Sequence, residues 1–143
     1  MKGAGERGIY HEGTKNTKVG MEFDPLSKQV IGCAIEVHRA LGPGLLESTY
    51  EQCLAHELSL AKIPTQSQVP ISLEYKGIRL DYSYRIDMIV DHQIVLELKS
   101  VDNILELHEA QLLTYMKLAR IKTGLLINFN VPVLKHGIRR FVL

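Results

Sequence analysis

The chain has 143 residues and a formal net charge of +1, with 45% hydrophobic and 23% charged residues. This length fits one domain with one hydrophobic core, and the composition excludes a disordered or collagen-like chain. Because the protein is not globally basic, any contact with nucleic acid would depend on a local patch of positive charge.

The first 23 residues differ from the rest, because glycines alternate with charged residues and few apolar side chains could form a periodic face. We expect a flexible tail at 1–23 followed by one domain at 24–143, and Met21 is a hypothetical functional start. Nothing resembles a signal peptide or a membrane span, so we expect a cytoplasmic protein without membrane contact. Cys33 and Cys53 are expected to be reduced, half-buried thiols.

Two helices are predicted first. Asp24 and Pro25 match the N-cap and the first position of a helix that ends at 42–44. A second helix is expected from Glu47 to Ala61. Apolar residues at helical spacing give the first helix one buried stripe, formed by Leu26, Val30, Ala34, Val37 and Leu41.

Strands follow, because the apolar period changes to two. We predict a strand at Val69–Tyr75, a turn at Lys76-Gly77, and a hairpin formed by Tyr84–Val90 and Gln93–Lys99. Ile86, Met88 and Val90 are expected to share one face. The remaining predicted elements are a helix at Leu105–Ala119, a buried strand at Gly124–Phe129 and a terminal strand at Gly137–Leu143.

The hairpin brings polar residues together. If its loop has three residues centred on His92, Asp87 lies directly opposite Glu97, with Cβ atoms about 4.5–5.5 Å apart. Lys99 lies two residues beyond Glu97 and shares its face. Two carboxylates this close repel unless a cation compensates, and hard oxygen ligands suit Mg²⁺ or Mn²⁺.

These residues are sufficient for phosphodiester hydrolysis. A bound Mg²⁺ could polarise the phosphodiester and help to generate hydroxide, and Lys99 could orient the water or stabilise developing charge. The alternative is that Glu97 and Lys99 form an ordinary solvated ion pair. The apolar residues of 94–98 favour the functional interpretation, because Glu and Lys are rarely buried without a role or a partner.

Several segments resemble the GxxExxY proteins, a branch of the PD-(D/E)XK nuclease superfamily, and the resemblance runs from Asp24 to Leu143. The naming pattern matches Gly44-Leu-Leu-Glu47-Ser-Thr-Tyr50. The other segments that carry the resemblance are Ile35-Glu36-Val-His38, Leu41-Gly-Pro-Gly44, Tyr84-Arg-Ile-Asp87, Glu97-Leu-Lys99, Gln111-Leu-Leu-Thr-Tyr115 and Gly124-Leu-Leu-Ile-Asn-Phe129.

The resemblance implies an α/β fold of the α+β sandwich type, in which helices flank a central mixed β-sheet as in restriction endonucleases. It also implies that Asp87 and Glu97 hold the metal and that Lys99 is the catalytic lysine. Glu47 would be a helical acid added to the metal site, although it could simply be an acid favoured by the helix dipole. Gln111, and with less support Tyr115, would border the site.

Two functions are weighed from this resemblance. The first is a metal-dependent nuclease or related phosphodiesterase that acts on DNA or RNA. The second is a domain of the same fold that binds a nucleic acid or a protein without cleaving it. A homo-oligomer is a third possibility for which the sequence has no specific sign. Tyr50 is expected to contribute to packing. His38 is expected to have a structural role outside the site.

Overall fold

A computed structural model describes residues 14–16, 23–80 and 84–143. Its elements are β1 (Thr14–Asn16), α1 (Pro25–Leu41), α2 (Glu47–Leu60), β2 (Thr65–Pro70), β3 (Leu73–Tyr75), β4 (Ile78–Leu80), β5 (Arg85–Val90), β6 (Ile94–Lys99), α3 (Glu106–Ala119), β7 (Thr123–Asn128), the 3₁₀ helix η1 (Leu134–Gly137) and β8 (Ile138–Val142). Of the predicted tail at 1–23, the described residues are 14–16, which pair with β8, and Phe23. The proposed tail boundary and the start at Met21 stay predictions.

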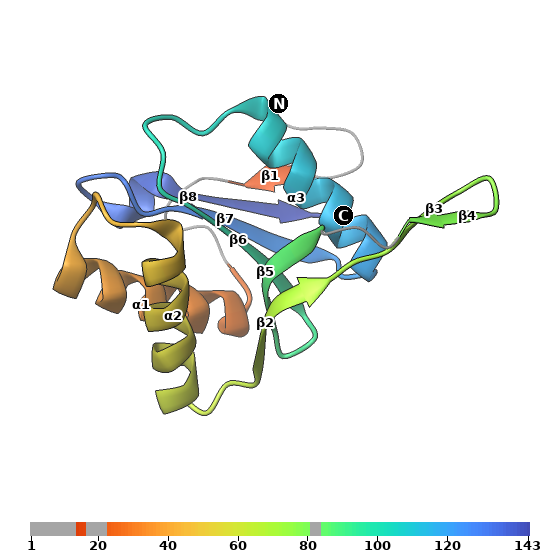
Figure 1. Cartoon of the computed structure of the whole chain (residues 1–143). Helices are drawn as coiled ribbons and strands as arrows, with labels where there is room; N and C mark the ends of the chain where they lie inside the picture. The colour runs from red at the N-terminus through yellow and green to blue at the C-terminus, as the bar shows by residue number, and fades with distance from the viewer. Residues whose placement is uncertain (1–13, 17–22, 81–83) are drawn as a thin grey trace.

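A mixed sheet with the strand order β1-β8-β7-β6-β5-β2 forms the centre of the molecule. The pair β6–β7 is parallel and is connected through α3, whereas the other neighbouring strands are antiparallel. Helices α1 and α2 cover one face and α3 covers the other (Figure 1). The predicted α+β sandwich with a central mixed sheet is therefore confirmed.

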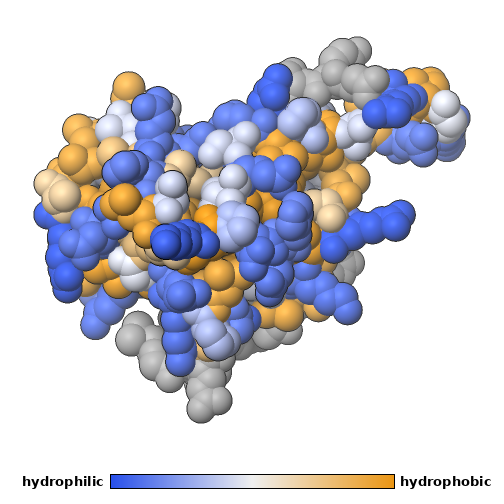
Figure 2. Space-filling view, turned by 90° about the horizontal axis from the view of Figure 1, so that it is seen from below, coloured by the Kyte–Doolittle hydropathy of each residue, from blue (hydrophilic) through white to orange (hydrophobic). Residues whose placement is uncertain are grey.

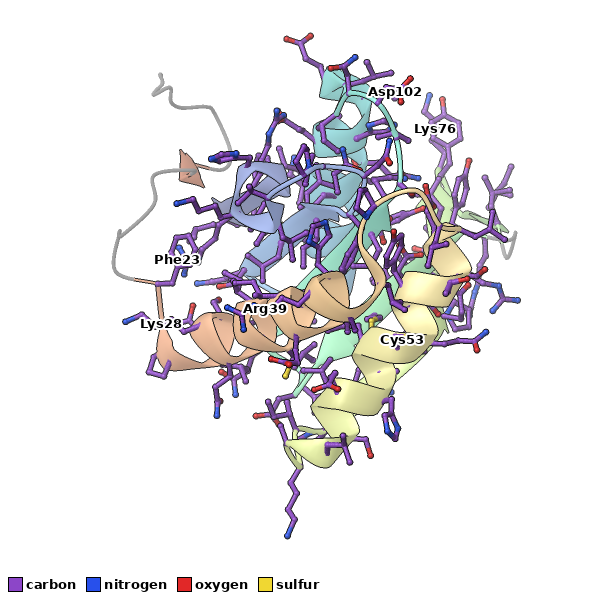
Figure 3. The ribbon with its side chains drawn as sticks, turned by 90° about the vertical axis from the view of Figure 1, so that its left-hand side faces the viewer. Phe23, Lys28, Arg39, Cys53, Lys76 and Asp102 are labelled. Atoms are coloured by element: carbon purple, nitrogen blue, oxygen red, sulfur yellow. The ribbon has the colours of Figure 1, made fainter. Side chains whose placement is uncertain are left out.

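Helix α1 begins where the sequence predicted. The Asp24 carboxylate accepts hydrogen bonds from the backbone N–H and the hydroxyl of Ser27, and Pro25 occupies the first turn. The helix ends at Gly42, whose φ of 70° suits glycine. Figure 3 views the molecule from the side of α1 and α2, with Phe23 and Lys28 marking the start of α1.

The sheet separates two apolar clusters. The larger one joins α1 and α2 to one face of the sheet, and the smaller one joins α3 to the other face. Both lie on the central strands, where parallel pairing buries both faces of β6 and β7. These strands are the rigid support from which the polar residues of the predicted hairpin project.

Three local predictions need correction. The strand expected to begin at Val69 begins at Thr65 and breaks after Pro70, since proline cannot donate to a ladder. Leu41 ends its helix 38% exposed, outside the buried stripe. Ile86 packs into the α3 cluster, whereas Met88 and Val90 pack into the α1–α2 cluster, so the alternation of β5 breaks at the residue between them.

A two-stranded arm, β3–β4, projects from the body of the molecule in Figures 1 and 2. Its turn residues Lys76 and Gly77 have φ values of 47° and 85°, as a type I′ hairpin turn requires. The turn predicted from Lys76-Gly77 is therefore confirmed. Figure 2 also shows polar and apolar residues interspersed over the face that it presents.

Two expectations concern the chain as a whole. Among the described residues, no helix is both long enough and apolar enough to cross a membrane. Cys33 and Cys53 are free thiols of intermediate exposure, as predicted. Cys53 lies on α2, on the side of the molecule that Figure 3 presents.

Candidate active site

The β5–β6 hairpin has the register on which the predicted site depends. Its pairs are Met88 with Leu96, Ile89 with Val95 and Val90 with Ile94, so the loop has three residues centred on His92. Asp91 and His92 both have positive φ, a conformation that these two residue types tolerate better than most. Continued beyond these pairs, the register would set Asp87 opposite Glu97, whereas the paired residues end at Met88 and Leu96.

The two strands separate at these acids. The Asp87 N–H donates a hydrogen bond to Glu97 Oε2 at 3.0 Å, and the Leu98 N–H donates to Asp87 Oδ2 at 2.8 Å. Each carboxylate thus accepts a hydrogen bond from a backbone N–H of the neighbouring strand. The other neighbour, β2, is distorted at the same level, because Gln68 has a φ of 52° between the pairs Ser67–Met88 and Val69–Ile86.

Burial and mutual repulsion make this pair of acids costly to ionise. Glu97 is 3% exposed, and burial followed by the charge of Asp87 raises its pKa from 4.5 to about 8. Burial also raises the pKa of Asp87, although the N–H bond from Leu98 and the charge of Lys99 oppose it. The site is therefore short of positive charge, which a divalent cation would supply.

Lys99 and Glu47 approach the acids from two different elements. Lys99 is at the end of β6, where its charge favours the ionised forms of Asp87 and Glu97. Glu47 is the first residue of α2, and its Oε2 accepts a hydrogen bond of 3.2 Å from the Ser100 N–H. This bond places Glu47 next to the residue that follows Lys99, and after burial the charge of Glu47 is a minor contribution to the raised pKa of both acids.

Helix α3 brings two more predicted residues to the same region. Gln111 Nε2 donates a hydrogen bond of 3.0 Å to the Tyr115 hydroxyl. Burial, and after it the charge of Glu97, raises the pKa of Tyr115, so this hydroxyl lies within electrostatic reach of the carboxylates. His108 lies one turn before Gln111, and burial followed by the charge of Lys99 lowers its pKa.

The donor set fits a hard divalent cation. Asp87 and Glu97 supply carboxylate oxygens, and Mg²⁺ commonly binds one or two protein carboxylates while it retains several waters. Within the described ranges, no group of three or more His, Cys, Asp or Glu residues is arranged to hold a metal ion. Glu47 is therefore near the pair without completing a three-acid cluster with it.

A comparison with protein families agrees with this arrangement. A model described as the PD-(D/E)XK nuclease superfamily matches residues 24–141, which is most of the chain. The chain belongs to the PD-(D/E)XK nuclease superfamily. No curated protein and no solved structure gave a significant match. Nucleases of this superfamily generally use divalent metals, which is consistent with the two adjacent carboxylates.

Two residues of the superfamily domain were missed by sequence reasoning. Gln68 of β2 lies close enough to Asp87 to lower the pKa of that carboxyl, and its Nε2 donates a hydrogen bond to Glu51 Oε1 at 2.8 Å. Glu51 lies one turn after Glu47 on α2, and the charge of Asp87 contributes to the raised pKa of Glu51. The four-residue spacing of Glu47 and Glu51 on one helix could have indicated that Glu51 lies near the site. No sequence pattern indicated Gln68.

Asn128 was missed for a different reason. It lies opposite Lys99 in the parallel ladder and is 2% exposed. Its side chain accepts from the N–H groups of Val101 and Asn130 and donates to the Val101 carbonyl, so it holds the segment that follows Lys99. A single Asn in an apolar strand was a signal for such a role.

Two further residues of the segments that carry the resemblance, Tyr50 and His38, have structural contacts. Tyr50 is fully buried, stacks on Phe129 at 4.3 Å, and bonds through its hydroxyl to Gly42 and Leu45. His38 Nε2 lies 2.8 Å from the Val131 carbonyl oxygen. Both residues have the structural surroundings that the sequence predicted.

Two basic residues of β8 are held in ion pairs with acids of other elements. Arg139 pairs with Glu109 of α3, and Arg140 pairs with Asp24. They join β8 to the two helices and therefore contribute to the fold rather than to a basic patch.

Proposed function

We propose that the chain is a metal-dependent nuclease that hydrolyses phosphodiester bonds of DNA or RNA. The observation that carries this proposal is the pair of carboxylates, Asp87 and Glu97, which face each other where the hairpin strands separate. Lys99 on the same strand and Glu47 from α2 surround the pair. Such a concentration of acid at the end of two buried strands is costly to the fold unless a cation compensates the charge.

In this proposal, Asp87 and Glu97 hold Mg²⁺ or Mn²⁺, and Glu47 joins them once the metal is bound. The cation would supply Lewis-acid polarisation of the phosphodiester and acidify bound water. Neutralisation of the acids by a cation also explains why they can be buried together, because their ionised forms would no longer repel each other without compensation.

The protein side chains perform the positioning. Lys99 carries a positive charge beside the carboxylates, from which it can orient the attacking water and stabilise charge that develops on the phosphate oxygens. Gln111 lies at the border of the site, where its amide can hold the substrate strand. We also propose the narrower GxxExxY assignment, which is supported by the proximity of Glu47 to the site and the packing role of Tyr50.

Cleavage assays test this proposal directly. Purified wild type is incubated with plasmid, single-stranded DNA and RNA in Mg²⁺ or Mn²⁺, beside Lys99→Ala, Asp87→Asn and Glu97→Gln. Loss of one charged group that stabilises a transition state is expected to lower kcat about 10²–10³-fold. Lys28→Ala is the matched control, because Lys28 is exposed at the start of α1. Cleavage that survives unchanged in Lys99→Ala and Glu97→Gln would come from a contaminant and would contradict the proposal.

The second candidate is a binding domain that does not cleave. It is favoured by the formal net charge of only +1, which gives the protein no broad positive field toward a nucleic-acid substrate. Calorimetry with Mg²⁺ or Mn²⁺ separates the two candidates. Heat of binding in wild type that disappears in Glu97→Gln supports the nuclease, whereas no heat in either protein supports the binding domain.

A further inference from the structure

We propose that the groove between α3 and the base of the β3–β4 arm binds unpaired nucleobases of the substrate. The substrate would then be a single strand, or a duplex with unpaired nucleotides beside the cleaved phosphate. This inference rests on the proposed function and narrows its substrate class.

The groove is a cavity of about 400 Å³ with two apolar walls. Ile71, Leu73 and Tyr84 form one wall, beside the arm, and the outward face of α3 forms the other. Leu107 and Leu118 belong to the α3 wall although they are 74% and 39% exposed. Leaving such side chains in water is unfavourable, so a flat apolar ligand would gain from covering them.

The groove lies next to the strand that carries Asp87, because Tyr84 of its wall comes directly before β5. His108, Gln111 and Tyr115 line it, and the charges of the site act on two of these residues. Glu97 contributes to the raised pKa of Tyr115, and Lys99 contributes to the lowered pKa of His108. In this proposal, a strand whose phosphate lies at Asp87 and Glu97 places a nearby nucleotide in the groove.

The chemistry of the groove matches a base better than an aliphatic ligand. Tyr84 is 50% exposed and offers an aromatic face on which any base can stack. The Gln111 amide both donates and accepts hydrogen bonds, so it can pair with a base edge.

These contacts discriminate between single and double strands. In a duplex the bases are stacked and paired inside, so a duplex phosphate at the site would leave the groove empty unless a base were flipped out. In a single strand the bases can enter the groove without breaking pairs. A protein segment in the groove would instead cover Gln111 and Tyr115 and compete with the substrate.

Fluorescence of 2-aminopurine tests the inference, because stacking quenches this base and the protein has no tryptophan. Full-length Lys99→Ala, which is expected to leave the strand intact, is titrated with single-stranded and duplex oligonucleotides that contain the analogue. We expect quenching with the single strand and binding at least about tenfold tighter than to the duplex. Tyr84→Ala in the same background should lose most of both effects.

Tyr75→Ala is the matched control, since Tyr75 is a 59% exposed tyrosine of the arm outside the groove lining. Equal binding of both strand types, or equal behaviour of Tyr84→Ala and Tyr75→Ala, would overturn the inference. A second copy of the chain is an alternative occupant of the groove. The inference would also be overturned if the protein self-associates and Leu118→Arg abolishes that self-association without weakening strand binding. If wild type cleaves all substrates and Tyr84→Ala changes nothing, the base-binding proposal is wrong and the nuclease proposal is retained. If nothing is cleaved and quenching persists, the nuclease proposal is wrong.

Discussion

Glu97 is deeply buried beside a second acid, and its pKa is unusually high as a result. Ser27, His38 and Asn128 are also buried and polar, and each bonds to a carboxylate or to backbone groups. Glu97 instead accepts one N–H bond beside a second carboxylate, which leaves much of its charge uncompensated. Its pKa of about 8 means that the metal-free folded protein holds a proton there at neutral pH.

Replacing Glu97 with Gln should therefore stabilise the metal-free protein. The folded state binds this proton up to a pKa of about 8 and the unfolded state only up to about 4.5, so wild-type stability falls as pH rises between these values. Glu97→Gln removes that loss and should raise the free energy of unfolding by about 1–4 kcal/mol at pH 8. Urea unfolding in chelator at pH 5 and pH 8 measures the difference.

The exposed Glu106 provides the control, because Glu106→Gln should change stability by less than about 0.5 kcal/mol at either pH. Added Mg²⁺ should raise the melting temperature of wild type and leave that of Glu97→Gln unchanged. A variant that is less stable than wild type at pH 8 without metal would show that Glu97 contributes to the fold as an ion.

The Asp24 side chain stabilises the start of α1 in two ways. Asp24 caps the helix through Ser27 and pairs with Arg140 of β8. Burial alone would raise the pKa of Asp24, but the hydrogen bonds from Ser27 and Arg140 outweigh it and hold the pKa below 3.8. The capping interaction therefore also fastens the helix to the sheet.

Asp24→Ala should cost about 1–2 kcal/mol, because the N-cap is lost and Arg140 loses its partner. Since the folded pKa is depressed, this stabilisation is complete above about pH 4 and is lost as pH falls through the folded value. Asp24→Asn should retain most of the cap and remove the pH dependence. Urea unfolding at pH 7 and pH 3 measures both effects, and equal losses for Asn and Ala would exclude the capping role.

The packing of α3 onto β7 depends on the absence of a side chain. A Cβ added at Gly124 would lie 2.5 Å from Met116 Sδ and 3.0 Å from Leu112 Cδ1. Gly124→Ala should therefore destabilise the protein by about 1–3 kcal/mol through overpacking. Because α3 carries Gln111 and Tyr115, cleavage should also weaken.

Gly32 of α1 provides a matched comparison, since a Cβ there would contact nothing within 4 Å. Gly32→Ala should stabilise the helix by about 0.5–1 kcal/mol. Thermal unfolding of both variants, with cleavage rates, tests the pair. Stabilisation by both substitutions would mean that Met116 moves aside freely.

The elements that could be predicted from the sequence are those determined by residues close together in the chain. The hairpin register followed from loop length and alternation, so the placement of Asp87 opposite Glu97 could be anticipated. The break in alternation at Asp87 could not, because it depends on how β2 and β6 pair with both sides of β5. Gln68 and Glu51 were missed because their meeting with Asp87 joins three segments of the chain.

At the scale of the whole molecule, the β3–β4 arm stands apart from the cores. Both apolar clusters are built from other elements, as far as the described residues extend. Tyr75 and Ile78 are each 59% exposed on the arm, and Lys76 lies over the Tyr75 ring. We therefore expect the arm to contribute little to the stability of the two clusters.

Replacing residues 73–80 with a short Gly-Ser linker should change the free energy of unfolding by less than about 1 kcal/mol. Binding of single-stranded DNA should weaken markedly, because Leu73 belongs to the groove wall. Urea unfolding and fluorescence anisotropy measure the two quantities. A large loss of stability would mean that the arm packs against the body more firmly than its exposure indicates.

A break in the chain at the tip of the arm, at Lys76-Gly77, would separate the candidate site residues into two fragments. A cut there would leave α1, α2 and Glu47 in one fragment and Asp87, Glu97, Lys99 and Gln111 in the other. The second fragment would keep the hairpin and α3, but it would lack the helices that cover one face of its sheet. Hydrolysis by a split form of the protein would therefore report reassembly of the two halves, and the arm is a natural place to build such a reporter.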